Sequence, residues 1–229
     1  MDILGMISSV THIIAQATND SGVLNWLAAK YEAGGLFMHP ILASLILGLS
    51  FCFERFWTLS RAKVNTKDFL IKVTTALKEG GVEEARDYCA STRGPVASVF
   101  HAGLLRADEG LEAAEKAIMA YGGIEMGFLE KGMIWISTCI TIAPMLGFTG
   151  TVQGMITAFD SIKEAAQISP AIVADGISVA LLTTLFGLVV AMILQVFYNF
   201  FISKIDKLVG EMEESSVQLI DALYEYKQK

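Results

Sequence analysis

Two apolar stretches decide the fold: residues 134–159 read IWISTCITIAPMLGFTGTVQGMITAF, and residues 168–202 read ISPAIVADGISVALLTTLFGLVVAMILQVFYNFFI. Each is longer than the roughly 20 mostly apolar residues that an α-helix needs to cross a bilayer. Only a few polar residues, around Lys163 and Glu164, separate them. We therefore predict a transmembrane hairpin within residues 132–202, with the extra length taken up by tilt or by turns in water.

A further span is predicted over residues 36–59. It ends in Glu54-Arg55 and an aromatic pair, Phe56-Trp57, which is typical of a span end at the membrane interface. Lys30 is the one basic residue before this span and Lys163 the one in the hairpin turn, whereas most basic residues near span ends lie on the opposite side. Because Lys and Arg favour the cytoplasm, we predict a multi-pass protein of the bacterial inner membrane, with a periplasmic N-terminus and a cytoplasmic C-terminus.

The remaining segments also have helical patterns. Residues 1–35 are predicted to form amphipathic helices at the outer membrane surface, with a signal segment as the alternative for residues 1–17. Residues 60–131 predict a cytoplasmic helical domain, broken at Gly80-Gly81 and before Pro95, whose last helix starts near Leu111 and runs into the second span. Residues 203–229 predict a cytoplasmic amphipathic helix.

The fold class is thus an all-α membrane protein with three transmembrane helices and long cytoplasmic helical extensions. Such extensions have apolar faces that need cover, and self-assembly would provide it. The apolar residues expected to face a core in the soluble segments are Phe69, Leu70, Val73, Leu77, Val99, Leu104, Leu105, Ile205, Leu208, Met212, Leu219 and Leu223.

Small and hydroxyl residues recur at helical spacing on one face of each hairpin helix. They are Ala143, Gly147, Thr151, Gly154 and Ala158 on the first, and Gly176, Ala180, Thr183, Thr184, Gly187 and Ala191 on the second. Such faces allow helix backbones to approach closely, and packing alone is one interpretation. The other is a narrow wet path lined by hydroxyls, which the threonines at mid-depth on both helices favour.

Several classes of function are disfavoured. The net charge of −7 is spread without a basic stripe, so we expect no nucleic-acid partner. The three cysteines and three histidines are scattered, so we expect no metal site, disulfide framework or cofactor. No nucleophile–base pair or phosphate-binding loop is visible, and we expect that the protein is not an enzyme.

The hairpin resembles the MotA/TolQ/ExbB proton-channel family. Residues 143–156, APMLGFTGTVQGMI, are similar to the family signature A-P-x-x-G-L-x-G-T-V-x-G-M-I. Residues 177–191, ISVALLTTLFGLVVA, are similar to its element I-x-x-A-L-x-T-T-x-x-G-L-x-V-A, and Tyr198-Asn199 falls where the family has Tyr-Asn. Three predicted spans instead of four point to the ExbB/TolQ branch.

The resemblance implies a pentameric ring around a pore that holds an ExbD-like or TolR-like single-span partner with an intramembrane Asp. Proton flow would then drive mechanical work for outer-membrane transport, through a TonB-like or other envelope-spanning protein. Alternatives are a TolQ-like motor for envelope integrity, a gliding or motility motor, and a non-conducting scaffold. Sodium remains open as the coupling ion.

The resemblance also implies which residues line the pore: Thr151, Thr184, Thr183, Gly147, Gly154, Ala180 and Gly187. Pro144 is either a static kink or a hinge, and Asp175 is either an entry residue for the ion or a solvated side chain. Two positions depart from the family, which often has Glu at Val179 and Pro at Ile193. Because residues 134–159 and 176–202 contain no Asp, Glu, Lys, Arg or His, the chain would have to borrow its carboxylate from the partner.

Overall fold

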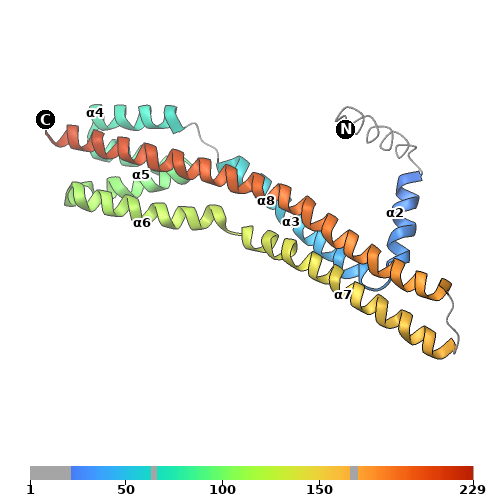
Figure 1. Cartoon of the computed structure of the whole chain (residues 1–229). Helices are drawn as coiled ribbons and strands as arrows, with labels where there is room; N and C mark the ends of the chain where they lie inside the picture. Colours follow the sequence, from blue (N-terminus) through green and yellow to red (C-terminus); the bar gives the residue numbers. More distant parts are fainter. Residues whose placement is uncertain (1–21, 63–65, 166–169, 229) are drawn as a thin grey trace, which may run out of the picture. The chain divides into compact units, whose positions relative to one another are not determined.

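The computed structural model describes residues 22–62, 66–165 and 170–228. Over this part of the chain the fold is all α-helical and contains no β-strand, as predicted. The elements of Figure 1 are α2 (Gly22–Ala33), α3 (Met38–Ala62), α4 (Thr66–Ser91), α5 (Pro95–Leu105), the 3₁₀ turn η1 (Ala107–Glu109), α6 (Leu111–Glu130), α7 (Met133–Ala165) and α8 (Pro170–Lys227). The predictions made for residues 1–21 lie outside the described residues.

Three helices of the described chain, α3, α7 and α8, are long and apolar enough to cross a membrane by length and composition. The prediction of three candidate spans is therefore confirmed. Lys163 and Glu164 were predicted to lie in the turn of the hairpin, but α7 continues through them to Ala165. Lys163 Nζ lies 3.1 Å from Asp160 Oδ1, a pair that belongs to the last turns of a helix, where a cation also interacts favourably with the helix dipole.

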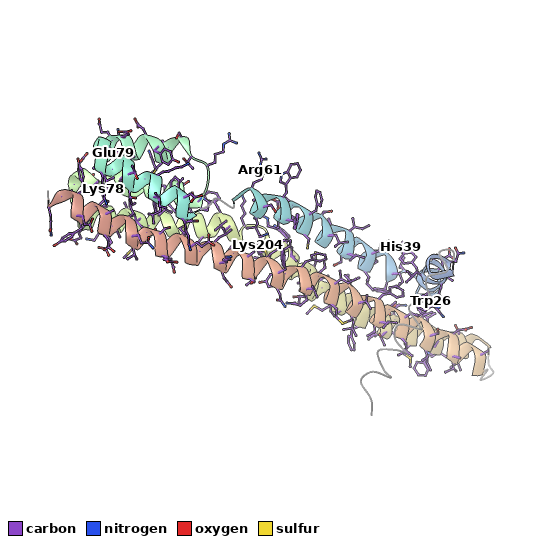
Figure 2. All side chains as sticks on the ribbon, turned by 90° about the horizontal axis from the view of Figure 1, so that it is seen from above. Trp26, His39, Arg61, Lys78, Glu79 and Lys204 are labelled. Atoms are coloured by element: carbon purple, nitrogen blue, oxygen red, sulfur yellow. The ribbon has the colours of Figure 1, made fainter. Side chains whose placement is uncertain are left out.

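The chain divides into two compact units, and the first comprises residues up to 47 together with residues 138–194. In this unit α7 and α8 lie side by side in opposite directions (Figure 1). Ser44 Oγ on α3 donates a hydrogen bond to the carbonyl oxygen of Cys139 on α7, at 3.4 Å. Figure 2 labels Trp26 on α2 and His39 at the start of α3, and the rings of Tyr31 and His39 lie 5.5 Å apart.

The second unit comprises residues 48–137 and 195–229 and contains the predicted helical domain. Its core is formed by one face each of α4, α5, α6 and the end of α8. The predicted core residues Phe69, Val73, Leu77, Val99, Leu104, Met212, Leu219 and Leu223 are buried there. Leu105 was expected to face the core as well, but it is 56% exposed, because α5 ends at this residue.

Two of the predicted helix breaks are confirmed. Gly81 has a φ of 79° and divides α4 into two helical pieces. Gly94 has a φ of 141° and precedes Pro95, the first residue of α5. Both glycines have positive φ angles, which are unfavourable for residues that carry a side chain. Pro95 is well suited to the first turn of a helix.

The prediction that the last cytoplasmic helix runs into the second span is wrong. α6 ends at Glu130, Lys131 has extended backbone angles (φ −53°, ψ 127°), and α7 begins at Met133. Between them Gly132 has a φ of 91°, which an α-helix cannot accommodate. The neighbouring Arg55 closes over this position, since a Cβ atom on Gly132 would lie 3.2 Å from its Nε atom. Gly122 and Gly123, in contrast, lie within α6.

The final helix, α8, is 58 residues long and continues without interruption from Pro170 to Lys227. Its last part has the predicted amphipathic pattern, with Ile205, Leu208 and Leu219 buried and the acidic residues between them largely exposed. Lys227 Nζ donates a hydrogen bond to the carbonyl oxygen of Ala107, which fixes the end of α8 to η1.

Candidate functional site in the α7–α8 hairpin

The small residues of the hairpin bring the backbones of α7 and α8 into direct contact. A Cβ atom on Gly187 would lie 2.6 Å from the carbonyl oxygen of Ala143, and one on Gly147 would lie 2.9 Å from the carbonyl oxygen of Thr183. Real Cβ atoms do not approach backbone so closely. Within one chain these predicted site glycines therefore have a packing role, and lining of a pore remains a prediction for them.

The same kind of contact continues towards the turn of the hairpin. A Cβ atom on Gly154 would lie 3.1 Å from both the Ala180 nitrogen and the Gly176 carbonyl oxygen, and Gly176 itself packs against Ala158. Ala180, also predicted as a site residue, is 2% exposed in this contact. Together these contacts set the register between α7 and α8, and with it the position of every polar group on the two helices.

Thr151 of α7 and Thr184 of α8 meet in the middle of this interface, and their hydroxyl groups form a hydrogen bond. Thr151 Oγ1 also lies 3.2 Å from the carbonyl oxygens of both Gly147 and Ala180, and Thr184 Oγ1 lies 3.3 Å from that of Gly147. Two hydroxyl protons thus have several acceptors within reach. Since each hydroxyl can donate and accept, rotation about the C–O bonds alone changes which acceptor each hydroxyl group donates to.

Thr183 is separate from this pair. Its side chain is 1% exposed and its hydroxyl group donates to the carbonyl oxygen of Ala180, at 2.8 Å. It also contacts α7, because a Cβ atom on Gly150 would lie 2.6 Å from Thr183 Oγ1. The described chain therefore gives Thr183 a role in helix packing, and Gly150, which the sequence did not single out, provides the space for it. The i, i+3 spacing of Gly147 and Gly150 was the available signal for that contact.

The two remaining predicted residues do not join the threonine pair. Pro144 is half-buried within α7, and the helix continues on both sides of it. Asp175 is exposed on α8 and forms no ion pair with the described residues. The backbone carbonyl groups of Gly147 and Ala180 were missed as functional atoms, because reading side-chain types along a sequence does not show which carbonyl groups face a neighbouring helix.

This arrangement can conduct or relay protons only with help from another molecule. It holds hydroxyl groups and carbonyl oxygens but no group that titrates near neutral pH. Hydroxyl groups can hold water and can stabilise a carboxylate by donating hydrogen bonds to it. The chemistry that the site offers is therefore hydrogen bonding to water or to a carboxylate placed beside it.

Comparison with known proteins gives consistent matches. Residues 91–214 match a family model described as the MotA/TolQ/ExbB proton channel family. The chain is 30% identical over 184 residues to a putative biopolymer transport protein ExbB homolog of Methanothermobacter thermautotrophicus, covering 80% of this chain and 65% of that protein. It is 31% identical over 171 residues to the putative biopolymer transport protein ExbB-like 1 of Synechocystis sp., covering 72% of this chain and 66% of that protein.

A third match is shorter. The chain is 32% identical over 93 residues to the biopolymer transport protein ExbB of Salmonella typhimurium, which is 41% of this chain and 38% of that protein. In each of these three comparisons the matched region is less than two thirds of the relative's length.

Proposed function

Because this chain belongs to the MotA/TolQ/ExbB proton channel family, ExbB/TolQ-like branch, we propose that it is the channel and motor subunit of an ion-driven machine in the bacterial inner membrane. In this proposal it acts with an ExbD-like or TolR-like single-span partner. The pair converts the proton gradient into mechanical work for transport across the outer membrane.

The observation that carries the proposal is the Thr151–Thr184 hydroxyl pair between two helices whose apolar parts contain no Asp, Glu, Lys, Arg or His. A path for protons through a membrane needs a titratable group or a continuous chain of water, and ionisable groups within spans are rare and usually functional. Since the chain has Val179 where many relatives have Glu, the carboxylate must come from the partner. The threonines then hydrogen-bond that carboxylate, or its water, as its charge changes.

The assembly is part of the same proposal. Five copies form a ring in the lipid bilayer, with the N-terminus in the periplasm and α7 and α8 facing the partner in the pore. Along that pore lie Thr151 and Thr184, together with the flanking small residues Gly147, Gly154, Ala180 and Gly187. The close backbone contacts of these small residues keep the pore surface narrow. Asp175, exposed at the outer end of α8, is the candidate entry residue for the ion.

The test is proton flux into liposomes that contain the purified complex with its single-span partner. Thr151→Val and Thr184→Val remove one hydroxyl each at nearly constant volume, and Asn in place of the partner's intramembrane Asp removes the carboxylate. We expect all three changes to reduce flux at least tenfold. Thr149→Val is the matched control, because among the described residues that exposed hydroxyl group bonds only to the carbonyl oxygen of Met145 in its own helix.

Flux that stays at the wild-type level in both threonine variants would contradict the proposed path. Complexes that assemble but conduct neither protons nor sodium would favour a non-conducting scaffold instead. The neighbouring genes would distinguish nutrient import from envelope integrity or motility. Genes for outer-membrane receptors beside the gene for a single-span partner would favour import.

A further inference from the structure

The outward faces of the hairpin carry two polar side chains that lack full hydrogen-bonding partners among the described residues. Gln153 on α7 is exposed, and the one hydrogen bond found for its side chain in the described residues is a long one, from Nε2 to Thr157 Oγ1 at 3.4 Å. Ser178 on α8 is exposed, and its hydroxyl group forms no hydrogen bond within the described chain. Lipid tails offer neither donors nor acceptors, so both groups gain from a polar partner.

These two side chains lie at the same height along the hairpin. Gly154 of α7 packs between Gly176 and Ala180 of α8. Its height, meaning its position along the axis of the hairpin, is therefore the same as that of residue 178. Gln153 is one residue away, which is about 1.5 Å along a helix axis. Both positions fall within the apolar stretches, and exposed Ile156, Ile177 and Leu181 surround them.

The side chain of Ser178 points away from the α7 helix of its own chain. Successive residues of a helix are rotated by about 100°, so Ser178 is about 200° from both Gly176 and Ala180, the residues that contact α7. Gln153 is about 200° from Thr151 and about 100° from Gly154, so it lies on a flank of α7, away from the hydroxyl pair. Among the described residues, neither side chain bonds to the other helix of its own hairpin, so both remain available to another molecule.

We propose that Gln153 of one copy hydrogen-bonds Ser178 of the next copy, and that this bond forms part of the lateral contact between neighbouring hairpins. The inference rests on the ring of the proposed function and specifies its membrane interface. A ring axis along the membrane normal relates residues of equal height, because rotation about that axis leaves height unchanged. Gln153 and Ser178 have equal heights, as the ring axis requires. The Gln153 amide has both donor and acceptor atoms for the Ser178 hydroxyl group.

The direct test is a disulfide that can form only between copies. Cys52, Cys89 and Cys139 are replaced by Ala. One tagged version of the chain then carries Gln153→Cys, and a version with a different tag carries Ser178→Cys. After co-expression and oxidation in membranes, we expect a linked pair that carries both tags. The matched control is Val179→Cys in place of Ser178→Cys, because Val179 is one residue away but faces its own chain. Its Cγ1 atom lies 3.7 Å from the position that a Cβ atom would take on Gly35.

We expect at least fivefold more product from the 153–178 combination than from the 153–179 combination. Equal yields, or no product from a complex that purifies as an oligomer, would overturn the contact. A second measurement tests the hydrogen bond itself: Gln153→Leu and Ser178→Ala should each weaken association of the copies about two- to threefold, and the double variant should be no weaker than either single variant. Additive losses would overturn the bond.

Proton flux measured on the same preparations separates this contact from the proposed function. A complex that conducts but does not cross-link would show that the contact is wrong while the function stands. Efficient cross-linking in a complex that conducts no ion would support the contact and contradict the function.

Discussion

At the scale of single residues, Gly187 shows how little room the hairpin leaves. We expect Gly187→Ala to lower stability by about 1–3 kcal/mol, the usual cost of overpacking, because the new methyl group would meet the Ala143 carbonyl oxygen and backbone cannot move aside cheaply. The measurement is the thermal unfolding midpoint in detergent. Gly210→Ala in the same helix is the control, since nothing lies within 4 Å of its Cβ position. Equal midpoints for the two variants would contradict the packing argument.

Cys89 provides a residue-scale prediction about pH. Burial raises the pKa of its thiol from 9.0 to about 12, because the thiolate would be poorly solvated in the core formed by α4 and α5. With Cys52 and Cys139 replaced by Ala, we expect Cys89 to resist alkylation at pH 8 until the second unit unfolds. Rapid labelling of folded protein would show that the site opens readily.

The same shift gives the sign of a stability effect. A raised pKa favours the protonated thiol in the folded state, so this contribution is fully present below pH 9. It is lost as pH rises from 9 towards 12, because only the unfolded state then releases the proton easily. Urea unfolding at pH 8 and at pH 10 measures the difference, and Cys89→Ala should remove it.

Side-chain types and spacing were enough to bring Thr151 and Thr184 together as candidates, because both lie on the small-residue faces of helices that had to pack. They were not enough to separate Thr183 from that pair. Adjacent residues differ by about 100° in direction, and only the register set by Gly150 and Gly154 decides which of the two threonines faces the other hydroxyl group.

At the scale of elements, the break between α6 and α7 depends on the backbone of Gly132. We expect Gly132→Ala to destabilise the second unit by about 1–2 kcal/mol, since a residue with a Cβ atom disfavours positive φ. Gly132→Asn should cost less, because Asn tolerates this region best among residues with side chains. Urea unfolding followed by circular dichroism measures both.

Gly127→Ala within α6 is the control for that experiment, since its Cβ position is open and the helix should be unharmed or strengthened. If Ala and Asn at position 132 were equally damaging, contact with Arg55 and not the backbone angle would be the cause.

The sequence predicted helix existence and type well for elements with a strong period, such as α5, α8 and both pieces of α4. It failed at the α6–α7 junction. That stretch contains three glycines, Gly122, Gly123 and Gly132, and in the sequence each is an equally good candidate for a helix break. In the structure the first two stay helical. What distinguishes Gly132 is the approach of Arg55 from α3, a contact between residues far apart in the chain.

At the scale of the whole molecule, orientation in the membrane is the prediction to test. We expect a Cys in place of Glu32, in α2, to react with a membrane-impermeant maleimide in intact cells, and a Cys in place of Glu79, in α4, to react only after the membrane is opened. Both side chains are exposed, and the native cysteines are replaced in the background. The physical reason is the excess of Lys and Arg on the side of α4. The reverse labelling pattern would invert the assignment of periplasm and cytoplasm.

The interlocked hairpin also has a consequence for how the protein is made. α7 leaves the ribosome before α8, and it is the less apolar of the two helices. On its own it would present the Thr151 hydroxyl group and a row of bare glycine backbone to lipid. Only the arrival of α8 supplies the Thr184 hydroxyl group and the surface that covers those glycines. We therefore expect insertion of α7 to be completed only once the segment that follows it has been translated, and a nascent chain that stops before α8 should remain a substrate for membrane quality control.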